Sequence, residues 1–229
     1  MDFLESPITF ILIGLNVIFS IIGFTNSNFK SKMIGWPYYE KNNKEYYRFL
    51  TSGFLHADWM HLIFNMFTLY SFGRNIEIIF AAGKLGGNIA YIALYFSGLI
   101  ISSIPSFLKY KDNKNYCSLG ASGAVSAVLF ASIIFSPWTE IYVYFIKASA
   151  ILFTIIYLVY SVYMSKNGGD NVNHDAHLWG ALFGIAFTVI LIAVLRSDLF
   201  PYILDDIKNP SIFGTRELNS TLSYIFSSR

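Results

Sequence analysis

The chain has 229 residues, of which 55% are hydrophobic, 18% aromatic and only 13% charged, with a formal net charge of +2. Soluble domains carry about 25% charged residues, so this composition excludes an ordinary soluble protein and indicates a membrane protein. It contains no Lys/Arg cluster with interleaved aromatic residues, so we expect no nucleic-acid partner.

Six apolar segments follow one another along the chain. Crossing about 30 Å of hydrocarbon takes about 20 helical residues, so several of these segments are short. Short central helices are expected where a water-filled cavity replaces lipid on one side. The sequence therefore predicts an all-α membrane protein, a bundle of six transmembrane helices. The segments are residues 7–24, 59–72, 85–104, 121–138, 148–164 and 176–195.

The first apolar segment could be taken for a secretory signal peptide. However, Met1 to Glu5 contain no Lys or Arg, and no clear small-x-small cleavage site precedes Thr25. We therefore expect a retained transmembrane helix. The lack of an Arg-rich transit segment favours a bacterial plasma (inner) membrane over an organelle.

The connections between the segments differ in kind. Residues 25–58 are rich in Lys, Tyr, Trp and Asn, and the run from Trp36 to Tyr39 favours a long first loop lying in the headgroup region. A solvated loop is the alternative. Residues 200–229 have no spanning run and are expected to form a soluble tail beyond a domain over 1–199. With the first loop set aside, the Lys/Arg distribution favours cytoplasmic termini and an active site towards the extracytoplasmic side.

Polar residues interrupt the second apolar segment. His61 and Asn65 are four residues apart and so share one helix face. Polar and ionisable side chains are costly inside a membrane, so they indicate a functional site by default. A hydrogen-bonded pair between helices is the alternative.

The fourth segment begins at Gly120-Ala121-Ser122-Gly123. A helix start leaves backbone N–H groups unpaired and carries a partial positive charge, which would stabilise an oxyanion. The glycines allow backbone and substrate to approach closely. The alternative is a contact between helices through small residues.

His177 begins the sixth segment and is followed by Gly180-x-x-x-Gly184. That glycine spacing predicts close packing of two helices, which would bring His177 to Ser122. A buried hydrogen-bonding histidine is the alternative. The four histidines of the chain could also form a metal site. However, the metal-binding motif HExxH does not occur, and we expect no metal and no cofactor.

Taken together, the motifs on the second, fourth and sixth segments resemble the rhomboid family of intramembrane serine proteases. The resemblance extends from about residue 45 to about residue 184, and the combination is specific although each motif alone is weak. Further matching elements are Glu45-Tyr46-Tyr47-Arg48, with Tyr47 where the family usually has Trp, then His56, and Gly73-Arg74 with Glu77.

The resemblance implies a Ser–His dyad without a carboxylate, with Ser122 as nucleophile and His177 as general base. It implies an oxyanion hole made by His61, Asn65 and the backbone N–H of Ser122. Serine needs an adjacent base to attack at neutral pH, and each oxyanion donor typically supplies about 3 kcal/mol. A base without an orienting Asp must be held by packing.

Two residues depart from the family pattern. Ser126 stands four residues after Ser122, where many family members have an aromatic residue that packs on the base. Leu119 replaces a glycine often seen before the serine motif. The first departure leaves open how His177 is held, and the second suggests a stiffer loop.

We expect an intramembrane serine endopeptidase that cleaves single-span transmembrane proteins near the membrane surface. Its substrates should carry Gly, Ser or Ala there, because a helix must unwind to expose a scissile carbonyl. The lipid bilayer surrounds the chain, and a six-helix enclosure can function as a monomer. One alternative is a non-catalytic relative that binds transmembrane clients, but such proteins generally lack the serine or the histidine. Another is a small transporter or channel, which predicts solute flux and no labelling by a serine-hydrolase probe.

Overall fold

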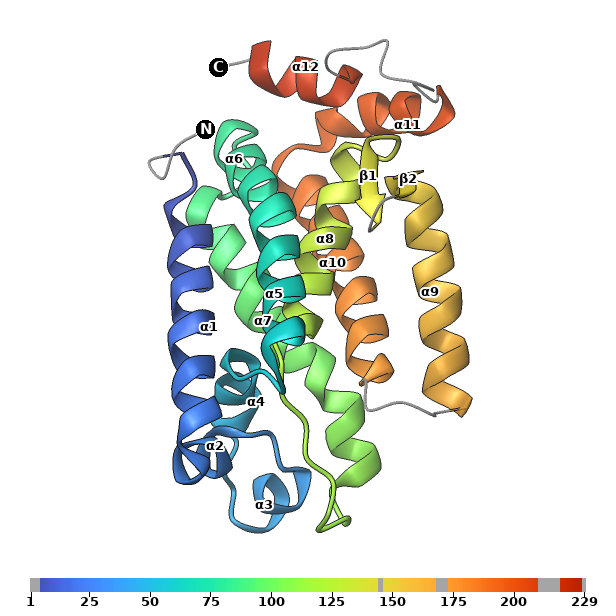
Figure 1. Ribbon diagram of the computed structural model, residues 1–229. Helices are drawn as coiled ribbons and strands as arrows, with labels where there is room; N and C mark the ends of the chain where they lie inside the picture. The colour runs from blue at the N-terminus through green and yellow to red at the C-terminus, as the bar shows by residue number, and fades with distance from the viewer. Residues whose placement is uncertain (1–4, 144–145, 168–172, 210–218, 228–229) are drawn as a thin grey trace.

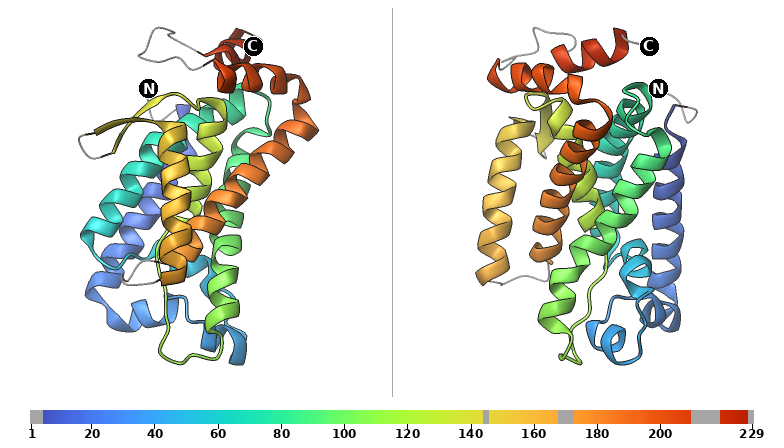
Figure 2. Two further views of the ribbon diagram at one scale, coloured as in Figure 1. Left: turned by 90° about the vertical axis from the view of Figure 1, so that its right-hand side faces the viewer. Right: turned by 180° about the vertical axis from the view of Figure 1, so that it is seen from behind.

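The computed structural model describes residues 5–143, 146–167, 173–209 and 219–227. Within this part of the chain, long helices stand side by side in a bundle (Figure 1). The start of α1 (Pro7–Thr25) and the last helix, α12 (Ser220–Ser227), lie at one end, and the short helices of the first loop lie at the other (Figures 1 and 2).

The helices follow the predicted apolar segments. Among the described residues, three helices are long and apolar enough to cross a membrane: α1, α7 (Gly87–Tyr110) and α10 (His174–Leu195). Two apolar helices, α8 (Ser122–Phe135) and α9 (Ala150–Asn167), are shorter. The chain is thus an all-α membrane protein, and the count of six spans stays a prediction.

The second predicted segment, for which the sequence leaves an extension past Gly73 open, does continue beyond it. Helix α5 (Trp59–Thr68) passes through a π-helical stretch (Leu69–Gly73) into α6 (Arg74–Ala82) without a break. Glu77 on α6 is buried and accepts hydrogen bonds from the backbone N–H groups of Ile8 and Thr9, at 2.9 and 2.8 Å. This carboxylate therefore satisfies orphan donors at the start of α1 and ties the first helix to the second.

The first loop is helical and folded against the bundle. Arg48 is buried, forms an ion pair with Glu45 at 2.5 Å, and donates to the carbonyl oxygens of Ser31 and Ile34 at 2.9 and 2.7 Å. The element Glu45-Tyr46-Tyr47-Arg48 therefore holds the loop together. The loop contains α2 (Ser27–Met33), α3 (Pro37–Asn42), α4 (Arg48–Thr51) and a 3-10 turn (Ser52–Phe54).

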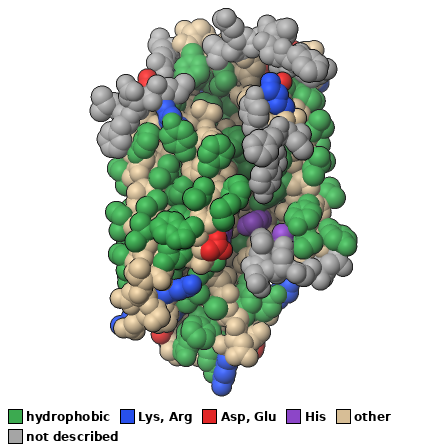
Figure 3. Space-filling view, viewed as in Figure 1, with side chains coloured by type: hydrophobic (Ala, Val, Ile, Leu, Met, Phe, Trp, Pro, Cys, Tyr) green, Lys and Arg blue, Asp and Glu red, His purple; other side chains and the backbone are tan. Residues whose placement is uncertain are grey.

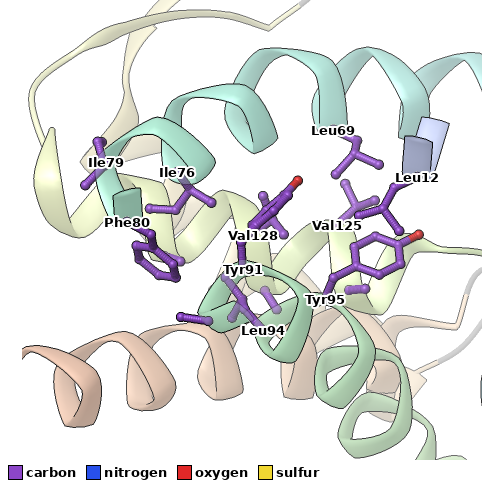
Figure 4. Close-up of a cluster of buried hydrophobic side chains, with 14 of the residues drawn as sticks. Leu12, Leu69, Ile76, Ile79, Phe80, Tyr91, Leu94, Tyr95, Val125 and Val128 are labelled. Carbon is purple, nitrogen blue, oxygen red and sulfur yellow. The ribbon is translucent and has the colours of Figure 1, made fainter. Parts of the chain in front are cut away.

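The main core lies where α1, α5, α6, α7 and α8 meet (Figure 4). Tyr91 and Tyr95 are fully buried there, and each satisfies its hydroxyl: Tyr91 with Thr9 Oγ1 at 3.0 Å and Tyr95 with Asn16 Nδ2 at 2.9 Å. Because each buried hydroxyl has a hydrogen-bond partner, the core can bury these large rings without leaving a polar group unsatisfied.

Two short elements were not predicted from the sequence. Strands β1 (Glu140–Val143) and β2 (Ile146–Ser149) pair antiparallel between α8 and α9.

Beyond a 3-10 turn (Ser197–Leu199), α11 (Phe200–Lys208) and α12 lie across the end of the bundle (Figure 1), with Ile203 and Ile225 buried in the main core. The division into a domain over 1–199 and a tail over 200–229 stays a prediction, but these two helices are packed on the bundle.

Candidate active site

Ser122 is the first residue of α8, and this helix begins partway along the bundle. After α7, the chain turns at the end of the molecule and runs back beside the helices before α8 starts (Figures 1 and 2). Ser122 is half-buried, and the unpaired N–H groups and the partial positive charge of a helix start lie around it.

The first loop holds the segment before Ser122 through backbone hydrogen bonds. Gly35 and Ser118 pair as an antiparallel bridge, with N···O distances of 3.0 and 2.9 Å. The N–H of Gly120 donates to the carbonyl oxygen of Ser52 at 3.0 Å. Because main-chain atoms make these contacts, the path of the chain into Ser122 depends little on side-chain identity.

Gly120 brings His61 next to Ser122. Its φ of +128° is rarely adopted by other residues, and a Cβ built on it would lie 2.8 Å from His61 Cε1 and 3.8 Å from Ser122 Oγ. Glycine is therefore required here both for its backbone conformation and for the space that the His61 ring occupies.

His61 and Asn65 lie one turn apart on α5, as their spacing predicts. Asp58 caps this helix by accepting from the N–H of His61 at 2.8 Å, which fixes where the helix starts. The Asn65 amide is buried and donates to the carbonyl oxygen of His61 at 2.9 Å. Asn65 is therefore buried and the His61 ring half-buried on one face of α5, and His61 lies beside the start of α8.

His56 packs against His61 and is fixed by α1. Its ring stands at 76° to that of His61 with 5.0 Å between centroids, and its Nδ1 lies 2.9 Å from Ser20 Oγ. Burial, reinforced by the nearby His61, lowers the pKa of His56 to about 3, so its ring is neutral at physiological pH. Neutral His56 supports His61 by packing.

The glycine motif of α10 packs on α8, and this predicted close contact of helices is confirmed. A Cβ on Gly180 would overlap the carbonyl of Gly123, and one on Gly184 would overlap the carbonyl of Ala127. The carbonyl oxygen of Ala176 lies 3.5 Å from a Cβ built on Gly123. The residues directly after Ser122 and directly before His177 are therefore neighbours.

The start of α10 is anchored to α7. Asn173 caps α10 by accepting from the N–H of Ala176 at 3.1 Å, and its amide donates to Ser106 Oγ at 2.9 Å. His177 lies in the first turn of this helix, so the cap fixes the position of the His177 backbone relative to α7.

Tyr157 on α9 is the site residue that sequence reasoning missed. Its ring stacks on His177 with 14° between the planes and 6.1 Å between centroids, and its hydroxyl lies 3.0 Å from Ser126 Oγ. The aromatic neighbour of His177 thus comes from the fifth apolar segment, and Ser126 anchors it. Nothing in the sequence distinguishes this tyrosine from the others on α9.

A small cavity of about 20 Å³ opens beside Ser122. Its lining includes Ser102, Ser118, Gly120 and Asn173. A cavity needs roughly 10–15 Å³ to hold one water molecule, which also needs polar partners, and this one meets both conditions.

Histidine side chains also reach the surface of the face seen in Figure 3, among hydrophobic side chains. Within the described ranges, no group of three or more His, Cys, Asp or Glu is placed to hold a metal ion. The arrangement offers a hydroxyl, an aromatic-backed imidazole and polar side chains around a helix start. The roles of Ser122, His177, His61 and Asn65 stay predictions.

Comparison with known proteins gives a consistent assignment. The Rhomboid domain matches residues 43–194, more than half of the chain. Similar proteins include "RHOMBOID-like protein 12, mitochondrial" of Arabidopsis thaliana, 30% identical over 67% of this chain and 47% of the relative. "Rhomboid-like protein 11, chloroplastic" of the same plant is 33% identical over 67% of this chain and 55% of the relative. "Presenilin-associated rhomboid-like protein, mitochondrial" of Rattus norvegicus is 32% identical over 59% of this chain and 36% of the relative.

The chain spans about half the length of the two plant relatives. The match covers α5 to α10 almost completely, and these helices contain all four candidate site residues. The chain belongs to the rhomboid family.

Proposed function

We propose that the chain is an intramembrane serine endopeptidase with six transmembrane helices. Ser122 is the nucleophile and His177 the general base that takes its proton. His61, Asn65 and the backbone N–H of Ser122 stabilise the negatively charged oxygen of the tetrahedral intermediate, which His177 then helps to resolve by protonating the leaving amine.

One observation carries this proposal: Gly120 and the α8–α10 contact bring three motifs from three helices to one place. A Cβ on Gly120 would touch both His61 and Ser122, while Gly123 next to Ser122 packs against Ala176 next to His177. A contact made only for packing would need small residues, but it would not need a histidine beside Gly120 or a serine and a histidine next to the packed residues Gly123 and Ala176.

The substrate class follows from where Ser122 lies. A nucleophile inside a membrane-embedded bundle meets peptide bonds of transmembrane segments, and their helical carbonyls are hydrogen-bonded until the helix unwinds. Single-span proteins with Gly, Ser or Ala near the membrane surface unwind most easily and are the proposed substrates. The protein acts as a monomer, in a lipid bilayer and without a cofactor.

The site opens towards the extracytoplasmic side, with the termini in the cytoplasm. The start of α1 and the last helix, α12, lie at the same end of the bundle (Figure 1). A chain that begins and ends on the same side of a membrane crosses it an even number of times, which supports six spans. A bacterial plasma membrane, expected from the sequence, has no support from the relatives, whose names place them in mitochondria or chloroplasts.

The test is labelling by a fluorophosphonate probe of the purified protein in detergent. The wild type should be labelled, and Ser122→Ala and His177→Ala should not. Ser132→Ala is the matched control, because Ser132 is a buried serine on the same helix that lies more than two turns from the half-buried Ser122. Labelling that persists in Ser122→Ala, or a folded wild type that is not labelled, contradicts the proposal.

Cleavage is tested in liposomes with a single-span protein that carries Gly-Ala near one end of its helix. The wild-type enzyme should cut the substrate that carries Gly-Ala. It should cut a substrate with Leu-Leu at the same two positions far more slowly. Equal cleavage of both versions would contradict the unwinding requirement but not the dyad.

A further inference from the structure

The ring of His177 is covered by the ring of Tyr157, which belongs to a different helix. Their planes differ by 14° and their centroids are 6.1 Å apart, within the range of offset aromatic contacts. Such a contact restricts rotation of the imidazole about its side-chain bonds. A general base must lie within hydrogen-bonding reach of the proton it takes, so this restriction bears directly on its task.

Tyr157 is itself held in place from α8. Its hydroxyl lies 3.0 Å from Ser126 Oγ, and Ser126 is 4% exposed. Ser126 lies one helical turn after Ser122, so the same helix positions the nucleophile and the anchor of the tyrosine. Phe130 and Phe153 also contact the tyrosine ring, at 5.6 and 5.7 Å between centroids.

A second contact joins α9 to the first turn of α10. Ser165 near the end of α9 donates a hydrogen bond to Asp175, which also forms an ion pair with Lys109 at 3.4 Å. The outer face of α9 is apolar and exposed, with Ile156 at 68% and Val159 at 65%. The other face of α9 contacts the first turn of α10 at two places, with Tyr157 on His177 and Ser165 on Asp175.

We propose that Tyr157 is the positioning residue of His177, with Ser126 as its anchor. The assignment rests on the proposed function, in which His177 is the base. Ser126 thereby has a role of its own: it is small enough to admit the ring of Tyr157 from α9 and polar enough to fix its hydroxyl. The rigidity of the base then depends on α9 being seated against α8.

The proposal predicts a specific kinetic pattern, measured as kinact and KI for the fluorophosphonate probe. Tyr157→Leu removes the ring and should lower kinact about 10- to 100-fold, because small displacements of reacting groups have effects of this size. KI should stay within about 2-fold, since binding of the probe does not use the imidazole orientation.

Two conservative variants separate the ring from the hydroxyl. Tyr157→Phe keeps the stacked ring and should restore kinact to within about 5-fold of the wild type, the usual effect of one lost hydrogen bond. Ser126→Ala should have the same effect as Tyr157→Phe. The double variant should be no worse than either single variant, because both remove the same hydrogen bond.

Tyr160→Leu is the matched control. Tyr160 lies one turn further along α9, is 50% exposed and packs edge-on against His174 rather than His177. It should leave kinact unchanged. A similar loss of kinact in both leucine variants, or none in Tyr157→Leu, overturns the positioning role. If the wild type itself is not labelled, the proposed function fails first, so the two failures are distinguishable.

Discussion

The two halves of the candidate dyad are held in different ways. Ser122 follows a segment whose Ser118 exchanges backbone hydrogen bonds with Gly35 and whose Gly120 N–H donates to the carbonyl oxygen of Ser52, and its helix starts there. His177 is fixed by side chains, with Tyr157 on its ring and glycine contacts beneath its helix. Backbone contacts tolerate most substitutions but fail at their glycines, whereas side-chain contacts fail wherever the side chain changes. The two halves should therefore respond differently to mutation.

The largest expected effect is at the backbone-held half. Gly120→Ala forces a non-glycine residue to φ +128° and places a Cβ 2.8 Å from His61 Cε1. We expect fluorophosphonate labelling to fall about 1000-fold, the upper end for a displaced oxyanion donor. Gly87→Ala is the control for a substitution at another positive-φ glycine, because Gly87 has a φ of +55°, which Lys84 also adopts, and has open space around it. It should leave labelling nearly unchanged, and an equal loss in both variants would mean that the contact with His61 is not responsible.

The next effect tests the oxyanion donors. Asn65→Ala should slow labelling about 100-fold while the protein stays folded, since one lost donor typically has this effect. The control is Thr68→Ala on the same helix, whose hydroxyl bonds the carbonyl of Phe64 at 2.9 Å and is exposed. Unchanged labelling in Asn65→Ala would show that Asn65 is not an oxyanion donor and serves only to stabilise its helix.

The third effect tests the glycine contact beneath His177. Gly180→Ala should lower the free energy of unfolding by about 2 kcal/mol, because its Cβ overlaps the carbonyl of Gly123 and the helices have to move apart. Thermal unfolding in detergent measures the change. Gly14→Ala on α1 is the control, since nothing lies within 4 Å of a Cβ at Gly14, and it should be neutral or slightly stabilising.

The smallest effect comes from the first loop that holds the serine segment. Burial raises the pKa of Glu40 from its ordinary value to about 7, although the hydrogen bond that it accepts from the N–H of Trp36 and the charge of the nearby Arg48 oppose this. The folded state therefore binds this proton more tightly, so the contribution of Glu40 to stability is present at low pH and is lost as the pH rises through 7. We expect a loss of about 1 kcal/mol between pH 6 and pH 8, which Glu40→Gln should abolish.

The control for this pH effect is Asp112→Asn. The exposed Asp112 accepts from Lys41 at 2.5 Å, and this bond lowers its pKa, so its own contribution changes only at acid pH. Thermal unfolding of Asp112→Asn should keep the dependence between pH 6 and pH 8. A dependence that survives in Glu40→Gln would have to come from another group.

The parts of the site that follow helix periodicity could be predicted from the sequence. The spacing of His61 and Asn65, the helix start at Ser122 and the close packing at Gly180 all depend on local geometry, which the chain encodes directly. Tyr157 could not be found this way. It is one of three tyrosines spaced by three residues on α9, and Tyr160 and Tyr163 are 50% and 62% exposed. Only tertiary packing decides which of them points inward.

The packing of the C-terminal residues also escaped prediction for a physical reason. Helices α11 and α12 are too short to span a membrane, and the mixed charge of residues 200–229 suggested a solvated tail. In the structure, buried Asp206 accepts from the N–H groups of Ser220 and Thr221, both at 2.9 Å, and this joins the two helices. Such long-range capping leaves no periodic pattern in the sequence.

The placement of the dyad on α8 and α10 has a consequence for biosynthesis. The ribosome delivers Ser122 well before His177, and at about 5–20 residues per second the interval is roughly 3 to 11 s. During that time the nascent chain has the proposed nucleophile but lacks the proposed base, and Gly180 has not yet docked on Gly123. If the two residues act as proposed, a newly made molecule cannot attack its neighbours until its last long helix has been inserted.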